Sequence, residues 1–170
     1  MKSKKNLVLL GMMGSGKSTI GKLLSKKLNF KFFDIDKIIQ KENNMTINEI
    51  FNSKGEVFFR QIEEDLTIKT LNHDNCIISL GGAAFLNQLI RKKTLTKSKT
   101  FWLDWKSKTI ISRIIKSKNR PVITGLSTKQ LEVLIKERSN IYAKANYKIN
   151  CNNLNKNEII EKILKIYESK

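Results

Sequence analysis

The chain of 170 residues contains little proline and cysteine, and each shortage excludes a class of protein. One proline and eight glycines exclude a proline-rich or collagen-like chain. The two cysteines, Cys76 and Cys151, form at most one bridge, so we expect a reducing compartment rather than a disulfide-stabilised scaffold. No run of about 18 apolar residues occurs, so we predict no membrane partner and a cytoplasmic protein. The length predicts one domain, 1–170.

Acidic residues are also scarce, and the net charge is +18 from 33 basic and 15 acidic side chains. Such a charge attracts nucleic acid and other polyanions. The lysines are scattered along the whole chain, however, whereas a nucleic-acid site gathers its positive charge on one face. We therefore predict no specific nucleic-acid partner, and a nucleic-acid-binding module remains the alternative from a different class of function.

The apolar residues alternate between short β-branched or aromatic runs and longer stretches of helical periodicity. Strand candidates are 6–10, 31–34, 76–80, 100–103 and 147–150. Helix candidates are 17–28, 36–42, 47–52, 56–71, 106–116, 128–145 and 157–168. This alternation predicts an α/β fold of three layers, in which helices cover both faces of a parallel sheet.

A glycine-rich loop lies between the first strand candidate and the first helix candidate. Residues 11–18 match the pattern G-x-x-x-x-G-K-[ST] without a mismatch. In this pattern backbone N–H groups surround the phosphates, Lys17 reaches the β- and γ-phosphates, and the Ser18 hydroxyl binds Mg²⁺. The alternative is a turn that a lysine happens to follow. We predict a nucleoside triphosphate site that includes Gly14, Ser15, Gly16, Lys17, Ser18 and Thr19.

Two carboxylates, Asp34 and Asp36, follow the second strand candidate. The carboxyl end of a strand beside a phosphate loop faces the ligand crevice of such a sheet. One carboxylate there can hold a metal ion, directly or through water, while the other accepts a proton from a substrate hydroxyl. The alternative is a solvated turn that caps the following helix.

Arg60 lies on a helix candidate with Glu63 and Glu64 three and four positions later. This spacing is typical of a surface ion pair, but a carboxylate can equally orient a guanidinium toward a bound anion. Gly81 and Gly82 follow the third strand candidate, where a ligand could approach the backbone closely. Two further residues, Trp102 and Trp105, flank the end of the fourth strand candidate, and we interpret them as packing residues.

A polar segment, 117–125, separates two helix candidates and contains the only proline, so it is a candidate lid. Around it, Arg113 and Arg120 are seven positions apart, and Arg138 precedes Tyr142 by four. Together with the phosphate loop, the D-x-D, the G-E-x-x-F-R-x-x-E helix and the two glycines, this order of motifs resembles shikimate kinase over the whole chain.

The resemblance implies a nucleoside-monophosphate-kinase-like P-loop fold with strand order 2-3-1-4-5. It implies a substrate-binding region at about 34–62, a lid at about 113–126, and a monomer. The implied reaction transfers the γ-phosphate of ATP to the 3-hydroxyl of shikimate, with one Mg²⁺ ion. A related small-molecule kinase, such as a gluconate kinase, is the alternative enzyme.

The resemblance also implies roles for single residues. Asp36 would hold the ring hydroxyls and act as the base, and Asp34 would assist the magnesium site together with Ser18. The shikimate carboxylate would contact Arg60 and Arg138, and the Gly82 backbone would position the ring. The remaining basic residues would serve the nucleotide and the transferring phosphate: Lys17, Arg113 and Arg120.

Overall fold

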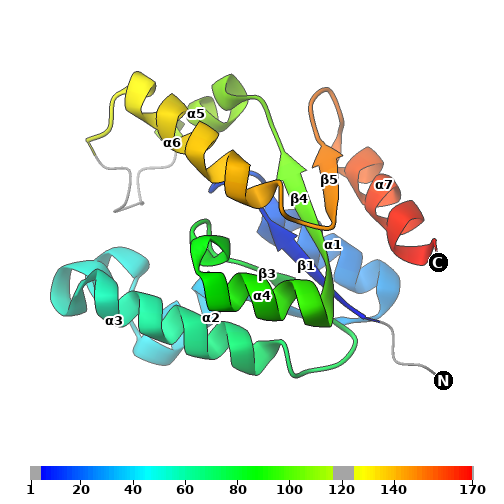
Figure 1. The fold of residues 1–170 in the computed structure, drawn as a ribbon, viewed down its shortest axis with the longest axis horizontal. Coiled ribbons are helices and arrows are strands. Elements are labelled where there is room, and N and C mark those ends of the chain that lie inside the picture. The colour runs from blue at the N-terminus through cyan, green and yellow to red at the C-terminus, as the bar shows by residue number, and fades with distance from the viewer. Residues whose placement is uncertain (1–4, 117–124, 170) are drawn as a thin grey trace.

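The computed structural model describes residues 5–116 and 125–169. Its sheet has five parallel strands in the order β2-β3-β1-β4-β5 (Figure 1). Their bounds are β1 (Asn6–Leu10), β2 (Lys31–Asp34), β3 (Cys76–Ser79), β4 (Ser98–Asp104) and β5 (Tyr147–Asn150). Because β1 is the central strand, the loop that follows it begins at the middle of the edge where the carboxyl ends of the strands lie.

Helices connect the successive strands, as parallel pairing requires, and a final helix follows β5. They are α1 (Lys17–Leu28), α2 (Ile35–Asn43), α3 (Ile47–Thr70), the 3₁₀ helix η1 (Ala84–Leu86), α4 (Gln88–Lys97), α5 (Ser107–Lys116), α6 (Thr128–Tyr142) and α7 (Lys156–Glu168). In Figure 1, α2 and α3 lie on one side of the view, whereas α5 and α6 lie on the other.

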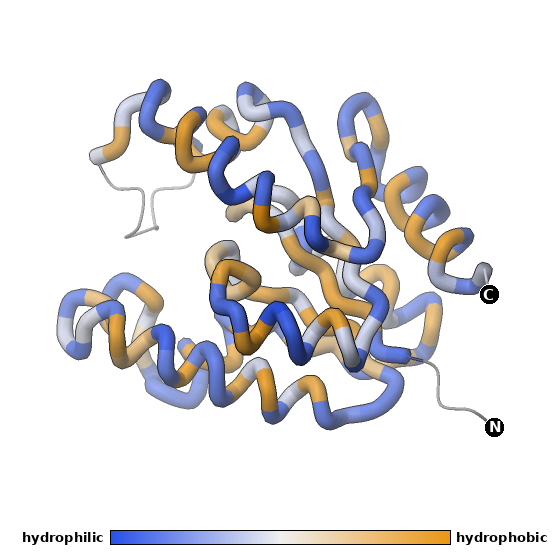
Figure 2. The backbone as a smooth tube through the Cα atoms, in the orientation of Figure 1, coloured by the Kyte–Doolittle hydropathy of each residue, from blue (hydrophilic) through white to orange (hydrophobic). Residues whose placement is uncertain are grey.

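Two hydrophobic clusters cover the two faces of the sheet. On one face, Leu7 and Leu9 of β1 pack with Ile20 of α1 and with Ile160 of α7. On the other face, Val8 of β1 packs in a cluster to which α2, α3, α4, α5 and α6 contribute. Figure 2 shows the same arrangement as apolar strands flanked by helices of mixed polarity. The three-layer architecture predicted from the sequence pattern and the strand order implied by the family resemblance are confirmed.

The boundaries of most elements agree with the prediction to within a few residues. The two helices expected at 47–52 and 56–71 are the two parts of α3, which meet at a kink at Gly55, where a φ of 83° and a ψ of 168° are not helical. Helix α4 was not predicted, because its sequence is rich in lysine and threonine and buries only Ile90 and Thr94. Among the residues described, no helix is long and apolar enough to span a membrane.

Candidate active site

The phosphate loop joins β1 to α1 at the carboxyl edge of the sheet. Gly16 caps α1 with a φ of 92°, a left-handed conformation in which a side chain would be strained. Lys17 is buried, and its Nζ donates hydrogen bonds to the carbonyls of Gly11 at 2.8 Å and Met12 at 2.9 Å. The ammonium group is thus held inside the curve of the loop, where a phosphate would sit.

A cavity of about 230 Å³ lies between the phosphate loop and the ends of β2 and β3. Asp34 and Asp36 line it from β2 and α2. The rest of its wall comes from the loop, the start of α1 and the turn after β3: Met13, Gly14, Gly16, Lys17, Ser18, Thr19, Ser79, Leu80 and Gly82. The two carboxylates therefore face the same space as Lys17 and Ser18, as the D-x-D position predicted.

Asp34 and Ser18 are suited to a hard divalent cation. Asp34 is buried, and its Oδ1 caps α2 by accepting the Lys37 N–H at 3.4 Å. Its Oδ2 is buried without a hydrogen-bond partner in the described part of the chain. Carboxylate and hydroxyl oxygens are the ligands that Mg²⁺ takes alongside phosphate oxygens, so these two residues fit a magnesium site. The described residues contain no group of three or more His, Cys, Asp or Glu side chains that could hold a metal ion by themselves.

A buried carboxylate, Glu63, forms the second part of the site. Its side chain is 2% exposed and accepts a hydrogen bond from Arg60 Nη1 at 2.7 Å. Burial raises the pKa of Glu63 to about 6, with a further upward contribution from Asp36, while Arg60 and Arg138 lower it. The pair is therefore not the surface ion pair that spacing alone suggested, because one partner is fully withdrawn from water.

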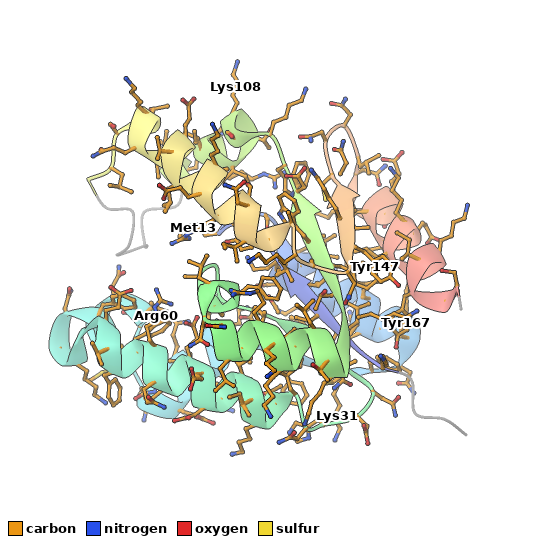
Figure 3. The ribbon with its side chains drawn as sticks, viewed as in Figure 1. Met13, Lys31, Arg60, Lys108, Tyr147 and Tyr167 are labelled. Atoms are coloured by element: carbon orange, nitrogen blue, oxygen red, sulfur yellow. The ribbon has the colours of Figure 1, made fainter. Side chains whose placement is uncertain are left out.

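Arg60 is oriented from both sides by carboxylates of α3. Glu56 Oε1 lies 3.2 Å from its Nη2 and Glu63 Oε2 lies 2.7 Å from its Nη1. Figure 3 shows Arg60 on the side of α3 that faces Met13 of the phosphate loop. Helix α3 thus presents toward the middle of the molecule a guanidinium whose two terminal nitrogens are held by ion pairs.

Arg138 and Tyr142 of α6 approach the same region from the opposite side. Arg138 is 5% exposed, and its Nε has no hydrogen-bond acceptor in the part of the chain that the structure describes. The Tyr142 hydroxyl donates a hydrogen bond to the Gly82 carbonyl. Burial raises the pKa of Tyr142 to about 12, so this hydroxyl stays protonated. A buried guanidinium with an unused N–H group is suited to an anionic ligand.

The turn after β3 brings these groups together. A Cβ atom placed on Gly81 would lie 2.8 Å from Asp36 Oδ1 and closer still to Glu63 Oε1. A Cβ atom on Gly82 would lie 3.7 Å from Arg138 Nη1. The two glycines thus leave room for side chains from α2, α3 and α6. Ala83 has a φ of −107°, which any residue adopts, so glycine is not needed there.

A larger pocket of about 760 Å³ lies on the other side of the phosphate loop, next to the start of α7. Arg113 and Trp105 line this pocket with Gly14, Thr19 and Asn155. Arg113 Nη1 donates a hydrogen bond to the Gly14 carbonyl at 3.1 Å, and its guanidinium lies 4.0 Å from the centre of the Trp105 ring. The pocket has the size of a small-molecule site and opens directly onto the loop.

The structure therefore places most of the predicted residues that it describes around two spaces beside the phosphate loop, whereas Arg60 and Arg138 line neither of them. Asp34 and Asp36 face the phosphate loop, Arg113 lines the larger pocket, and Arg138 lies against Gly82. Arg120 and most of the candidate lid, 117–124, lie outside the described residues. Two contacts at the site were not predicted: that of Trp105 with the phosphate loop and that of Tyr142 with Gly82. Both join segments far apart in the chain, and no local pattern signals them.

A parallel sheet of this order, with a G-x-x-x-x-G-K-[ST] loop between β1 and α1, defines a P-loop NTPase fold of the nucleoside-monophosphate-kinase-like type. Comparison with known proteins narrows this class. Residues 13–168 match the family model described as shikimate kinase. The chain belongs to the shikimate kinase family, whose members are kinases that transfer phosphate to shikimate.

Single relatives agree over nearly the full length. Shikimate kinase of Sulfurihydrogenibium sp. is 37% identical over 160 residues, covering 94% of this chain and 96% of the relative. Shikimate kinase of Bacillus licheniformis is 40% identical, covering 95% and 93%. The solved structure of shikimate kinase from Acinetobacter baumannii in complex with shikimate aligns with a TM-score of 0.91 at 28% identity, covering 98% of this chain and 96% of that one.

Proposed function

We propose that this protein transfers the γ-phosphate of ATP to the 3-hydroxyl of shikimate, giving shikimate 3-phosphate and ADP. The observation that carries the proposal is the shared cavity in which Asp34 and Asp36 face Lys17 and Ser18. A phosphate donor and a hydroxyl acceptor bound there would meet at the carboxyl edge of the sheet. Phosphoryl transfer requires mainly positioning and charge stabilisation, which this arrangement supplies.

Asp36 is the proposed base. It stands in the first turn of α2, half-buried, between the phosphate loop and the turn after β3. A carboxylate at this position accepts hydrogen bonds from ring hydroxyls and takes the proton of the attacking hydroxyl. The substrate-binding region would then comprise about 34–62, together with the turn that contains Gly82.

Arg60 and Arg138 are proposed to bind the shikimate carboxylate from two sides. The orientation of Arg60 by Glu63 and the burial of Arg138 support this role. Two guanidinium groups give bidentate, charge-assisted hydrogen bonds to a carboxylate. The Gly82 backbone, held through its carbonyl by Tyr142, would lie against the ring.

The nucleotide is proposed to span both spaces. Its phosphates would contact the loop residues Gly14 to Thr19, and the base would enter the pocket beside Arg113. Ser18 and Asp34 would hold a Mg²⁺ ion, Asp34 directly or through water, and the ion would neutralise negative charge on the phosphates. Arg120, which belongs to the candidate lid, is proposed to stabilise charge on the transferring phosphate.

We also propose that the enzyme acts as a monomer in the cytoplasm. Cys76 and Cys151 are both buried and unbridged, which suits a reducing compartment.

The replacement Asp36→Asn tests the proposed base. It keeps the size of the side chain but cannot take up the proton, so shikimate turnover should fall by a factor of about 10² to 10⁴. The dissociation constant for ADP, measured by calorimetry, should stay within about twofold. Glu42→Gln on the same helix removes the same charge from an exposed position and should keep wild-type turnover. Turnover of Asp36→Asn at the level of this control would remove Asp36 from the base role.

A further inference from the structure

Trp105 occupies a position that core packing alone does not explain. It follows directly after β4, is partly buried, and packs against both hydrophobic clusters, so it sits at the edge of the sheet between the two faces. One part of its indole lines the 760 Å³ pocket beside the phosphate loop. The neighbouring Trp102, in contrast, is 5% exposed within β4 and packs on Tyr142.

The indole N–H holds the phosphate loop. Trp105 Nε1 donates a hydrogen bond to the Ser15 carbonyl at 2.9 Å, joining residues that are 90 positions apart. In a planar trans peptide the C=O and the following N–H point in opposite directions. Fixing the Ser15 carbonyl on the Trp105 side therefore turns the Gly16 N–H to the opposite side. Gly16 caps α1 and lines both spaces of the site.

The indole ring holds the arginine of the pocket. The Arg113 guanidinium lies 4.0 Å from the centre of the ring, a short distance for a cation–π contact. The same guanidinium donates to the Gly14 carbonyl at 3.1 Å. Trp105 thus contacts the loop directly at Ser15 and indirectly, through Arg113, at Gly14.

We propose that Trp105 is a positioning residue for the nucleoside triphosphate, setting the conformation of the phosphate loop through its N–H and the orientation of Arg113 through its ring. The inference rests on the proposed function in that the bound ligand is a nucleotide. The two contacts are separable, because one uses the indole nitrogen and the other uses the ring face.

Two replacements separate the contacts, with ADP as the calorimetric probe. Trp105→Phe keeps a ring face but removes the N–H, and should weaken ADP binding about threefold to tenfold, as expected for one lost hydrogen bond. Trp105→Leu also removes the ring, and should weaken binding by about a further two- to fivefold. When Arg113 is also replaced by alanine, the ring of Phe at position 105 has no guanidinium to contact. The ADP affinities of the Trp105→Phe and Trp105→Leu proteins should then differ by less than about twofold. In both variants the KM for ATP should rise while the KM for shikimate stays within about twofold of wild type.

Fluorescence supplies a readout that does not depend on turnover. In Trp102→Phe, where Trp105 is the remaining tryptophan, ADP should change the emission, whereas in Trp105→Phe it should not. Unchanged ADP affinity in Trp105→Phe, with the wild-type thermal melt, would overturn the inference. So would an equal rise of both KM values. If Trp105→Leu does not fold, Trp105→Phe alone decides. A wild-type protein that binds ADP but does not phosphorylate shikimate contradicts the proposed function and leaves this test intact.

Discussion

At the scale of single residues, the candidate site is built from charges that are withdrawn from water. Glu63, Arg138 and Lys17 are each less than one tenth exposed. Burying a charge is costly unless partners compensate it. Lys17 donates hydrogen bonds to the Gly11 and Met12 carbonyls, and Glu63 is paired with Arg60. Glu63 is central, because Arg60, Asp36 and Arg138 all influence the pKa of its carboxyl group.

Glu63 should make stability depend on pH in a defined direction. The folded pKa of about 6 lies above the ordinary value of 4.5 for a glutamate carboxyl group, so the folded protein takes up this proton first as the pH falls. The contribution of Glu63 to stability is therefore fully present below pH 4.5 and is lost as the pH rises through about 6. Relative to Glu63→Gln, the wild type should gain about 2 kcal/mol in its free energy of unfolding between pH 7 and pH 4. Urea unfolding of both proteins at the two pH values measures this difference, and an equal difference at both would contradict it.

The residues of the site were predictable to different degrees. Asp34, Asp36 and Arg60 stand in short motifs at fixed places along the chain, and the structure brings the first two to the phosphate loop. The sequence indicates only a packing role for Trp105. Its contact with Ser15 could not be predicted, because it joins residues that are 90 positions apart. The burial of Glu63 was equally invisible, since its spacing from Arg60 is the same in a surface ion pair.

At the scale of elements, periodicity predicted the strands and most helices but not how they meet. The strand candidates coincide with β1, β2 and β5, whose apolar or aromatic runs are bounded by polar residues and glycine. Helix α4 was missed, because a stripe of two buried residues gives no recognisable period. The turn after β3 is an example of a contact that periodicity does not predict. In the sequence it is only a pair of glycines, whereas in the structure side chains from α2, α3 and α6 lie against it.

Gly81→Ala tests the importance of that turn. The new methyl group would displace the Asp36 and Glu63 carboxylates, and Glu63 has little room to move, because it is buried and ion-paired. A displacement of about 1 Å can cost a factor of up to about 10², so turnover should fall at least about tenfold. ADP binding should stay within about twofold, since the phosphate loop follows a different strand.

Ala83→Gly is the matched control for this prediction. It alters the same turn at a position whose φ of −107° suits both residues. Its turnover should remain within about twofold of wild type. The account of the turn would fail if Gly81→Ala behaved like Ala83→Gly.

At the scale of the whole molecule, the topology brings the functional residues to one edge of the sheet. The loop after β1, the D-x-D after β2 and the glycine turn after β3 come from adjacent strands, so strand order alone places them together. This consequence could be predicted because the family resemblance implied the strand order, which the assignment of strands alone does not give. The net charge of +18, in contrast, is spread along the whole chain and has no such focus in the sequence.

The most direct measurement of the central claim is a coupled assay of ADP release with Mg-ATP. Shikimate, gluconate and nucleoside monophosphates are offered in parallel as acceptors, and binding of ADP is measured on the same preparation. We predict turnover with shikimate and none above the ATP-only background with the other acceptors. ADP binding without turnover on shikimate would contradict the assignment of the acceptor while leaving the P-loop site in place.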